Sequence, residues 1–156
     1  MSRLELTESL NEKFAETATD SIDVRAAGIR SSGDVGSTLA ALADSLCHFR
    51  MILVDARDLT LSERDRASMI RAATIGVRVV VAATSPLSGF PPMLVLHEND
   101  FPRALVASIY NLPPAQSLFV LTPIPAGSIR GLVRHAMRWR ASWRDPEEGD
   151  FRSNPA

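Results

Sequence analysis

Residues 77–83 read Val-Arg-Val-Val-Val-Ala-Ala, and this stretch decides the fold. A short, continuous run of branched apolar residues favours a β-strand that is covered on both faces. Residues 51–54 and 118–121 have the same character. Strands of this kind are typical of parallel sheets, because crossover helices cover both sides. We therefore expect residues 79–81 to lie in a central strand of such a sheet.

Helical patterns alternate with the strand-like stretches. Apolar residues recur at helical spacing within residues 10–18, 35–46, 61–73, 102–109 and 129–137. Weaker strand-like stretches lie at residues 3–6, 22–26 and 93–96. Alternation of this kind predicts right-handed βαβ units. The expected class is α/β, with three layers, helices on both faces and a largely parallel sheet of about five or six strands.

The composition indicates one globular domain. The chain has 156 residues, of which 46% are hydrophobic and 22% are charged. We expect a single α/β domain over residues 1–144 and a polar tail over residues 145–156. The formal net charge of -1 gives the whole chain no attraction to nucleic acid or to an anionic membrane.

Cysteine usage and hydropathy predict a cytoplasmic protein. Cys47 is the only cysteine, so no internal disulfide can form, and we expect it to be a small buried side chain. No secretory leader precedes the first expected helix. No apolar run approaches the roughly 20 residues that a membrane span needs.

Polar residues stand at the ends of the expected strands. Asp55 follows one apolar run, Thr84 ends the next, and Thr122 ends the last. Together with the stretch Arg-Leu-Glu-Leu-Thr-Glu at residues 3–8, this order resembles a response-regulator receiver domain. The resemblance runs from about residue 3 to about residue 140 and implies a flavodoxin-like sheet with Asp55 as phosphoacceptor.

The chain departs from the receiver pattern where the chemistry takes place. Receivers hold Mg²⁺ with further acidic side chains, and a lysine neutralises the phosphoryl charge. Here only Glu8 stands near the acidic position, Thr122 occupies the lysine position, and Lys13 is the only lysine. The resemblance therefore implies an eroded pocket of Glu8, Thr84 and Thr122. We expect a non-enzymatic pseudo-receiver, without cofactor or metal, that signals by contact with a protein partner or as a homodimer.

Two alternatives remain open. Residues 24–29, 54–60 and 80–86 are similar to a STAS or SpoIIAA-like domain, although its phosphoserine motif is missing and Ser62 is the nearest substitute. The second alternative is a functional phosphoacceptor at Asp55. In the opposing structural interpretation, the Asp55 carboxylate caps a loop or pairs with Arg57. Strand order separates the two families. The receiver order is 2-1-3-4-5, all parallel, whereas a STAS sheet is mixed and has an antiparallel first pair.

Other motifs favour structural roles. Gly-Asp-Val-Gly-Ser-Thr at residues 33–38 lacks the lysine and the glycine spacing of a phosphate loop, so we expect a helix capped by Asp34 or a nearby serine. Cys47 and His48 are adjacent and cannot face each other on a helix. The histidines lack metal-ligand spacing, so no metal site is expected.

The last expected helix carries the candidate interface. Its inward stripe consists of Ile129, Leu132, Val133, Ala136 and Met137. Arg140 falls in the middle of this stripe, which predicts that the stripe leaves the core near Met137. We therefore expect Arg138, Trp139, Arg140 and Trp143 to form the interface, because tryptophan and arginine are enriched in interfaces. Nucleic acid is not an expected partner, because acidic residues follow within 145–150.

Overall fold

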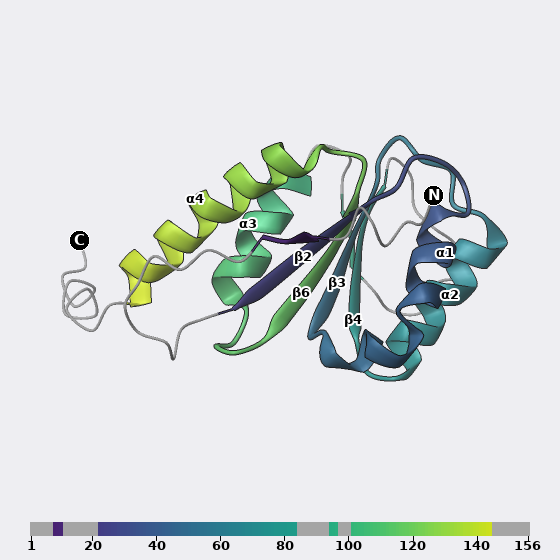
Figure 1. Ribbon diagram of the computed structural model, residues 1–156, viewed down its shortest axis with the longest axis horizontal. Helices are drawn as coiled ribbons and strands as arrows, with labels where there is room; N and C mark the ends of the chain where they lie inside the picture. The colour runs from purple at the N-terminus through teal and green to yellow at the C-terminus, as the bar shows by residue number, and fades with distance from the viewer. Residues whose placement is uncertain (1–7, 11–21, 84–93, 97–100, 145–156) are drawn as a thin grey trace.

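The computed structural model describes residues 8–10, 22–83, 94–96 and 101–144 (Figure 1). Strands and helices alternate along these residues, which confirms the α/β class. The elements, in chain order, are β1 (Glu8–Ser9), β2 (Asp23–Gly28), α1 (Asp34–Ala41), the 3₁₀ helix η3 (Ala43–His48), β3 (Met51–Ala56), α2 (Glu63–Thr74), β4 (Arg78–Ala83), β5 (Leu94–Leu96), α3 (Phe101–Asn111), β6 (Ser117–Thr122) and α4 (Ala126–Arg144).

The sheet has the order β1-β2-β6-β3-β4-β5. Its centre consists of β2, β6, β3 and β4, which are parallel and have 6 residues each. Two short segments extend it: β1, with 2 residues, is antiparallel to β2, and β5, with 3 residues, is parallel to β4. Within the described residues, the full-length strands are thus these four rather than the five or six expected.

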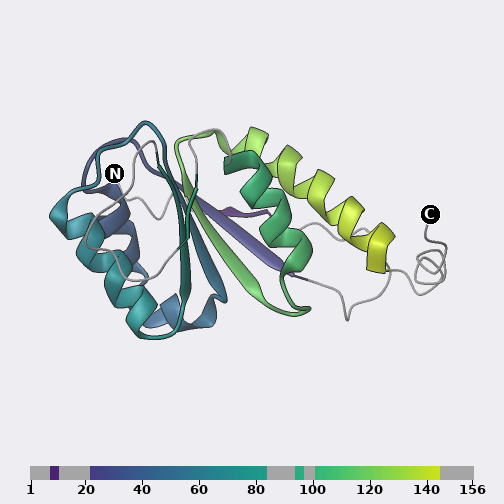
Figure 2. The same cartoon turned by 180° about the vertical axis from the view of Figure 1, so that it is seen from behind.

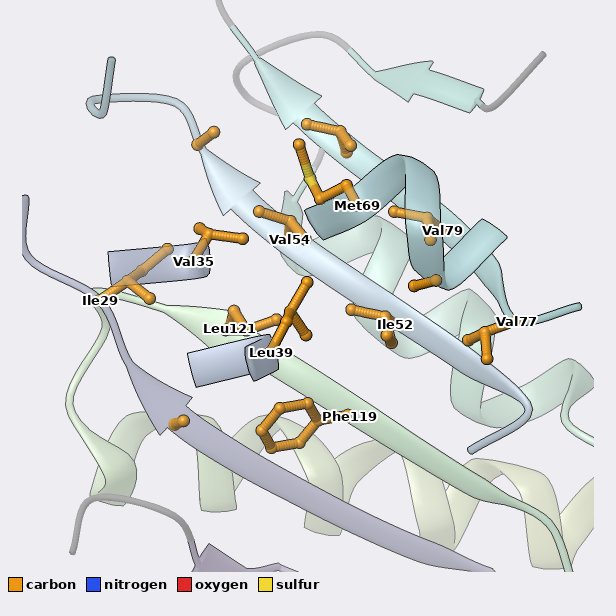
Figure 3. Packing of buried hydrophobic residues seen from close by; sticks show 14 of the residues in the cluster. Ile29, Val35, Leu39, Ile52, Val54, Met69, Val77, Val79, Phe119 and Leu121 are labelled. Carbon is orange, nitrogen blue, oxygen red and sulfur yellow. The ribbon is translucent and has the colours of Figure 1, made fainter. Parts of the chain in front are cut away.

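Helices cover both faces of the sheet, as the sequence predicts. In two views from opposite sides, α1 and α2 lie on one side of the sheet, and α3 and α4 lie on the other (Figures 1 and 2). The side chains of β4 alternate between the two cores: Val79 and Val81 pack toward α1 and α2, whereas Val80 and Ala82 pack toward α3 and α4. Figure 3 shows the first core, with Met69 of α2 beside the sheet residues.

The position of β6 differs from the order that the receiver resemblance implies. That order places the first strand between the second and third, and the last strand at an edge beside the fourth. Here β6, the last strand, lies between β2 and β3, and the first strand, β1, is an antiparallel edge. The crossover through α3 therefore returns the chain from the β5 edge across β4 and β3 before β6 pairs.

The expected helix over residues 35–46 is broken into two parts. The α-helical part, α1, ends at Ala41, and the chain continues in the tighter 3₁₀ helix η3. The change of periodicity keeps Leu46 buried but leaves Cys47 exposed. The prediction that Cys47 is a buried side chain is therefore wrong.

Helix α1 is capped by a residue from another helix rather than by its own side chains. Gly33 is the N-cap, its φ of 95° lies in the left-handed region, and no side chain caps α1 from that position. Asp34, the expected cap, instead accepts hydrogen bonds from the backbone N–H groups of Arg30 and Ser31, at 2.7 and 2.9 Å. It therefore fixes the turn that precedes the helix.

The carboxylate of Asp65 caps α1 and α2 together. Asp65 is fully buried, and it accepts hydrogen bonds from the backbone N–H groups of Gly33, Gly36 and Ser62, each at 2.8 Å. Its own N–H donates to Ser62 Oγ at 3.1 Å, which completes a capping box. The two helices approach so closely that a Cβ on Gly36 would stand 3.2 Å from the carbonyl oxygen of Arg64.

Replacing Asp65 tests this shared cap. Asp65→Ala leaves three N–H groups without their acceptor, so we expect the free energy of unfolding to fall by about 2–4 kcal/mol. Urea denaturation measures the change. Glu63→Ala is the control, because this carboxylate lies in the same first turn with its side chain 96% exposed. The control should change stability by no more than about 0.5 kcal/mol. Equal stability of the two variants would contradict the shared cap.

Candidate functional site

Asp55 and Thr122 lie side by side at the carboxyl edge of the sheet. Asp55 belongs to β3 and Thr122 to β6, and the register pairs Val54 with Leu121, one residue earlier. Both side chains have the same parity as Leu53 and Val120, which pack in the core beneath α3 and α4. The two polar groups therefore face the α3 side of the sheet, at the edge where ligands bind in parallel α/β proteins.

The protein itself occupies both oxygens of the Asp55 carboxylate. Arg57 binds as a fork: its Nε donates to Oδ1 at 2.7 Å, and its Nη2 donates to Oδ2 at 2.8 Å. The hydroxyl of Thr122 donates to Oδ2 at 2.9 Å. Asp55 is 1% exposed. We call Asp55, Arg57 and Thr122 the Asp55 cluster.

Neighbouring groups fix the two donors of the Asp55 cluster in place. The backbone N–H of Ile124 donates to Thr122 Oγ1 at 3.1 Å, which leaves the threonine proton for Asp55. The guanidinium carbon of Arg57 lies 5.2 Å from the ring centroid of Phe101, the first residue of α3. A buried carboxylate is costly unless it is paired and hydrogen-bonded, and here both conditions are met. The ion pair with Arg57 is the structural role that the sequence also predicts for Asp55.

The predicted pocket residues are not brought together as a set. Thr122 contacts Asp55, whereas Glu8 lies in β1, with β2 and β6 between it and β3. At about 4.8 Å per strand, Glu8 is roughly 14 Å from the Asp55 strand. Thr84 lies outside the described residues. Among the residues that are described, no three His, Cys, Asp or Glu side chains are grouped to hold a metal ion.

The crevice at this edge is small. The chain leaves β2 toward α1 and leaves β6 toward α4, on opposite faces, so β2 and β6 flank a topological switch point. The hollow there has a volume of about 130 Å³. Its described lining runs over residues 26–30 and 122–126. This volume is well below the roughly 300–1,000 Å³ that small-molecule sites occupy.

Arg140 is a structural residue of α4, which corrects its place in the expected interface. It is fully buried, and its Nη1 donates to the carbonyl oxygens of Ile109 and Tyr110, at 2.8 and 2.9 Å. These carbonyls belong to the last turn of α3, where a cation also meets the negative end of the helix dipole. The prediction that the inward stripe leaves the core near Met137 is wrong, because Arg140 continues it.

Trp139 and Arg138 lie on the outer side of α4. Trp139 is 45% exposed, and its ring centroid lies 4.9 Å from that of Tyr110. Arg138 is exposed. The side chain of Trp143 lies outside the described residues. Of the four expected interface residues, the structure therefore places these two on the surface.

No family model matches this chain, and no curated protein or solved structure matches it. No described helix is both long enough and apolar enough to cross a membrane.

The closed Asp55 cluster predicts resistance to phosphorylation. Incubation with acetyl phosphate and Mg²⁺ should produce little or no stable aspartyl phosphate, because both carboxylate oxygens are engaged and no lysine replaces Thr122. Intact-protein mass spectrometry measures the modification. Stoichiometric, Mg²⁺-dependent modification that disappears in Asp55→Asn would refute the prediction.

Two arginines of α4 that are two residues apart, Arg140 and Arg138, test the cap on α3. Arg140→Met removes the donor to two carbonyls at the end of α3, and we expect a loss of about 1–3 kcal/mol in the free energy of unfolding. Arg138→Met removes the same charge from an exposed position on the same helix and should cost about 0.5 kcal/mol or less. Similar denaturation midpoints for the two variants would show that the hydrogen bonds of Arg140 contribute nothing to the stability of the fold.

Proposed function

We propose that this chain is a non-catalytic regulatory module that acts by contact with a protein partner or with a second copy of itself. The observation that carries the proposal is the closure of Asp55 by Arg57 and Thr122. A phosphoacceptor carboxylate needs an accessible oxygen and a metal ion to neutralise the incoming charge. In the Asp55 cluster, a guanidinium and a hydroxyl take these places. A cytoplasmic location, supported by the single cysteine, is part of the proposal.

The outer side of α4 supplies the proposed contact surface. Trp139 combines a large apolar ring with an indole N–H, and such residues dominate binding energies at protein interfaces. Arg138, the residue before Trp139 in the same helix, is also exposed. We define Trp139 and Arg138 as the α4 surface. Its charge favours a protein surface rich in carboxylates.

The proposal does not depend on the receiver resemblance, because the strand order gives that resemblance no support. The antiparallel pair of β1 and β2 instead favours the STAS-like alternative, whose sheet begins with such a pair. In that alternative Ser62 would carry the regulatory phosphate. Ser62 Oγ already caps α2 by accepting from Asp65 N–H, and a phosphate there would stand close to the Asp65 carboxylate. This geometry favours a module regulated by contact over one regulated by modification of Ser62.

Replacing Trp139 tests the α4 surface. Trp139→Ala should weaken self-association or partner binding at least tenfold, because the substitution removes a large exposed anchor. The melting temperature should change by only a few degrees, since the ring is 45% exposed. Light scattering measures self-association, and affinity purification with quantitative mass spectrometry measures partner binding.

Ile75→Ala is the matched control. Ile75 is 49% exposed and is the other large exposed hydrophobic side chain among the described residues, at the end of α2 on the opposite face. It should leave association unchanged. The α4 surface would be abandoned if both variants associated like wild type, or if Trp139→Ala melted far earlier with an unchanged molecular mass.

A further inference from the structure

A second and larger hollow lies at the opposite end of the sheet from the Asp55 cluster. Its volume is about 640 Å³, within the roughly 300–1,000 Å³ that small-molecule sites occupy. It is bounded by the amino ends of β3 and β4 and by one side of α3. The described residues that line it are Arg50, Met51, Gly76, Arg78, Val80, Arg103, Ala104, Ala107, Ser108, Asn111, Leu112 and Pro113.

The hollow exists because α3 turns small residues toward this part of the sheet. Leu105 and Ile109 are fully buried in the core that α3 shares with α4. The adjacent side of the helix carries Ala104, Ala107 and Ser108, which line the hollow. These side chains are too short to fill the space over β4. The floor beneath them is apolar and is formed by Met51 and Val80.

Two arginines line one end of the hollow. Arg50 immediately precedes β3, and Arg78 is the first residue of β4, so their backbones are neighbours: the N–H of Arg78 lies 3.4 Å from the carbonyl oxygen of Arg50. Arg78 has the same parity as Val80 and therefore faces the α3 side of the sheet. Asn111, at the end of α3, lines the same hollow and adds an amide.

The positive charge at this end has no counterpart in the described part of the chain. Neither Arg50 nor Arg78 has an ion pair with a described carboxylate. The described residues that line the hollow include no aspartate or glutamate. Arg103, in the first turn of α3, stands about 12 Å from Asn111 along the helix axis, at the other end of the hollow. A guanidinium fork matches phosphate oxygens in geometry as well as charge.

We propose that this hollow binds a small organic phosphate with an apolar carbon body. The phosphate lies at Arg50 and Arg78, and the carbon body lies over Met51 and Val80 beneath the alanines of α3. No aromatic side chain is among the described lining residues, so the apolar part is held by aliphatic contacts rather than by stacking. The site goes beyond the proposed regulatory contact and is independent of it, because it shares no residue with the Asp55 cluster or the α4 surface.

Three probe molecules test the contributions of the phosphate and of the apolar body separately. Hexyl phosphate carries the anion and the apolar body, inorganic phosphate carries the anion alone, and hexanol carries the body alone. Isothermal titration calorimetry should show hexyl phosphate binding at least tenfold more tightly than either of the others. Amide chemical-shift changes in two-dimensional NMR should concentrate at the amino ends of β3 and β4 and along α3.

Amino-acid substitutions distinguish binding in this hollow from a general effect of positive charge. Arg78→Met should weaken hexyl phosphate binding at least tenfold, and Ala104→Leu should do the same by filling the hollow while keeping every arginine. Arg71→Met is the control, because it removes one exposed positive charge from α2 on the other face of the sheet and should leave binding unchanged. If Arg78→Met melts early, Arg50→Met replaces it, since Arg50 is exposed and precedes the strand.

Three results would overturn the proposal. The first is an affinity for hexyl phosphate that is no higher than the affinity for hexanol. The second is equal affinity in wild type and in the folded arginine variant. The third is binding to phosphatidic acid vesicles that depends on Arg78 while free hexyl phosphate does not bind, because the ligand would then be a lipid surface rather than a small molecule.

Discussion

The pairing of β6 with β2 on one side and with β3 on the other is the constraint on which the rest of the structure depends. Without β6, the pair β1–β2 and the group β3–β4–β5 share no strand contact. The same pairing sets Thr122 beside Asp55 and brings α4 over β2. The hydrophobic cores on both faces also include β6 residues: Phe119 and Leu121 belong to one, and Val120 to the other.

The strands were predictable from sequence, but their order was not. Residues 51–54, 79–81 and 118–121 are continuous apolar runs, which is the pattern of a strand covered on both faces, and all three lie in strands. Runs of this kind are nearly equivalent to one another, so they carry little information about which neighbour each strand pairs with. The place of β6 is set by the long crossover through α3, and no local pattern encodes it.

Local patterns also failed where a side chain acts across elements. A helical wheel places Arg140 in the inward stripe of α4, but its charge indicates that the stripe leaves the core there, whereas its long side chain reaches two carbonyls of α3. A helical wheel contains no information about which other helix packs against it. The cap of α1 is similar, because Ser62 and Asp65 predict a capping box on α2 but say nothing about Gly33. Arg140 and Asp65 are both charged and buried, so their roles follow from the packing of two helices.

The candidate site was predictable in part. Asp55 and Thr122 were expected together because the receiver resemblance places both in one pocket at the ends of apolar strands, and the structure joins them by a hydrogen bond. Arg57 was visible only as a structural alternative, although it lies two residues from Asp55 and decides the chemistry of the carboxylate. Glu8 was grouped with them on the strength of the resemblance alone, and the strands that separate it from Asp55 come from other parts of the chain.

The central place of β6 also determines what a growing chain exposes during synthesis. Translation from Ala56, the end of β3, to Thr122, the end of β6, takes roughly 3–13 s at about 5–20 residues per second. Throughout that interval β2 and β3 each present an unpaired backbone edge to the solvent. Such edges pair readily with other strands, so the nascent chain is open to aggregation until its last strand emerges.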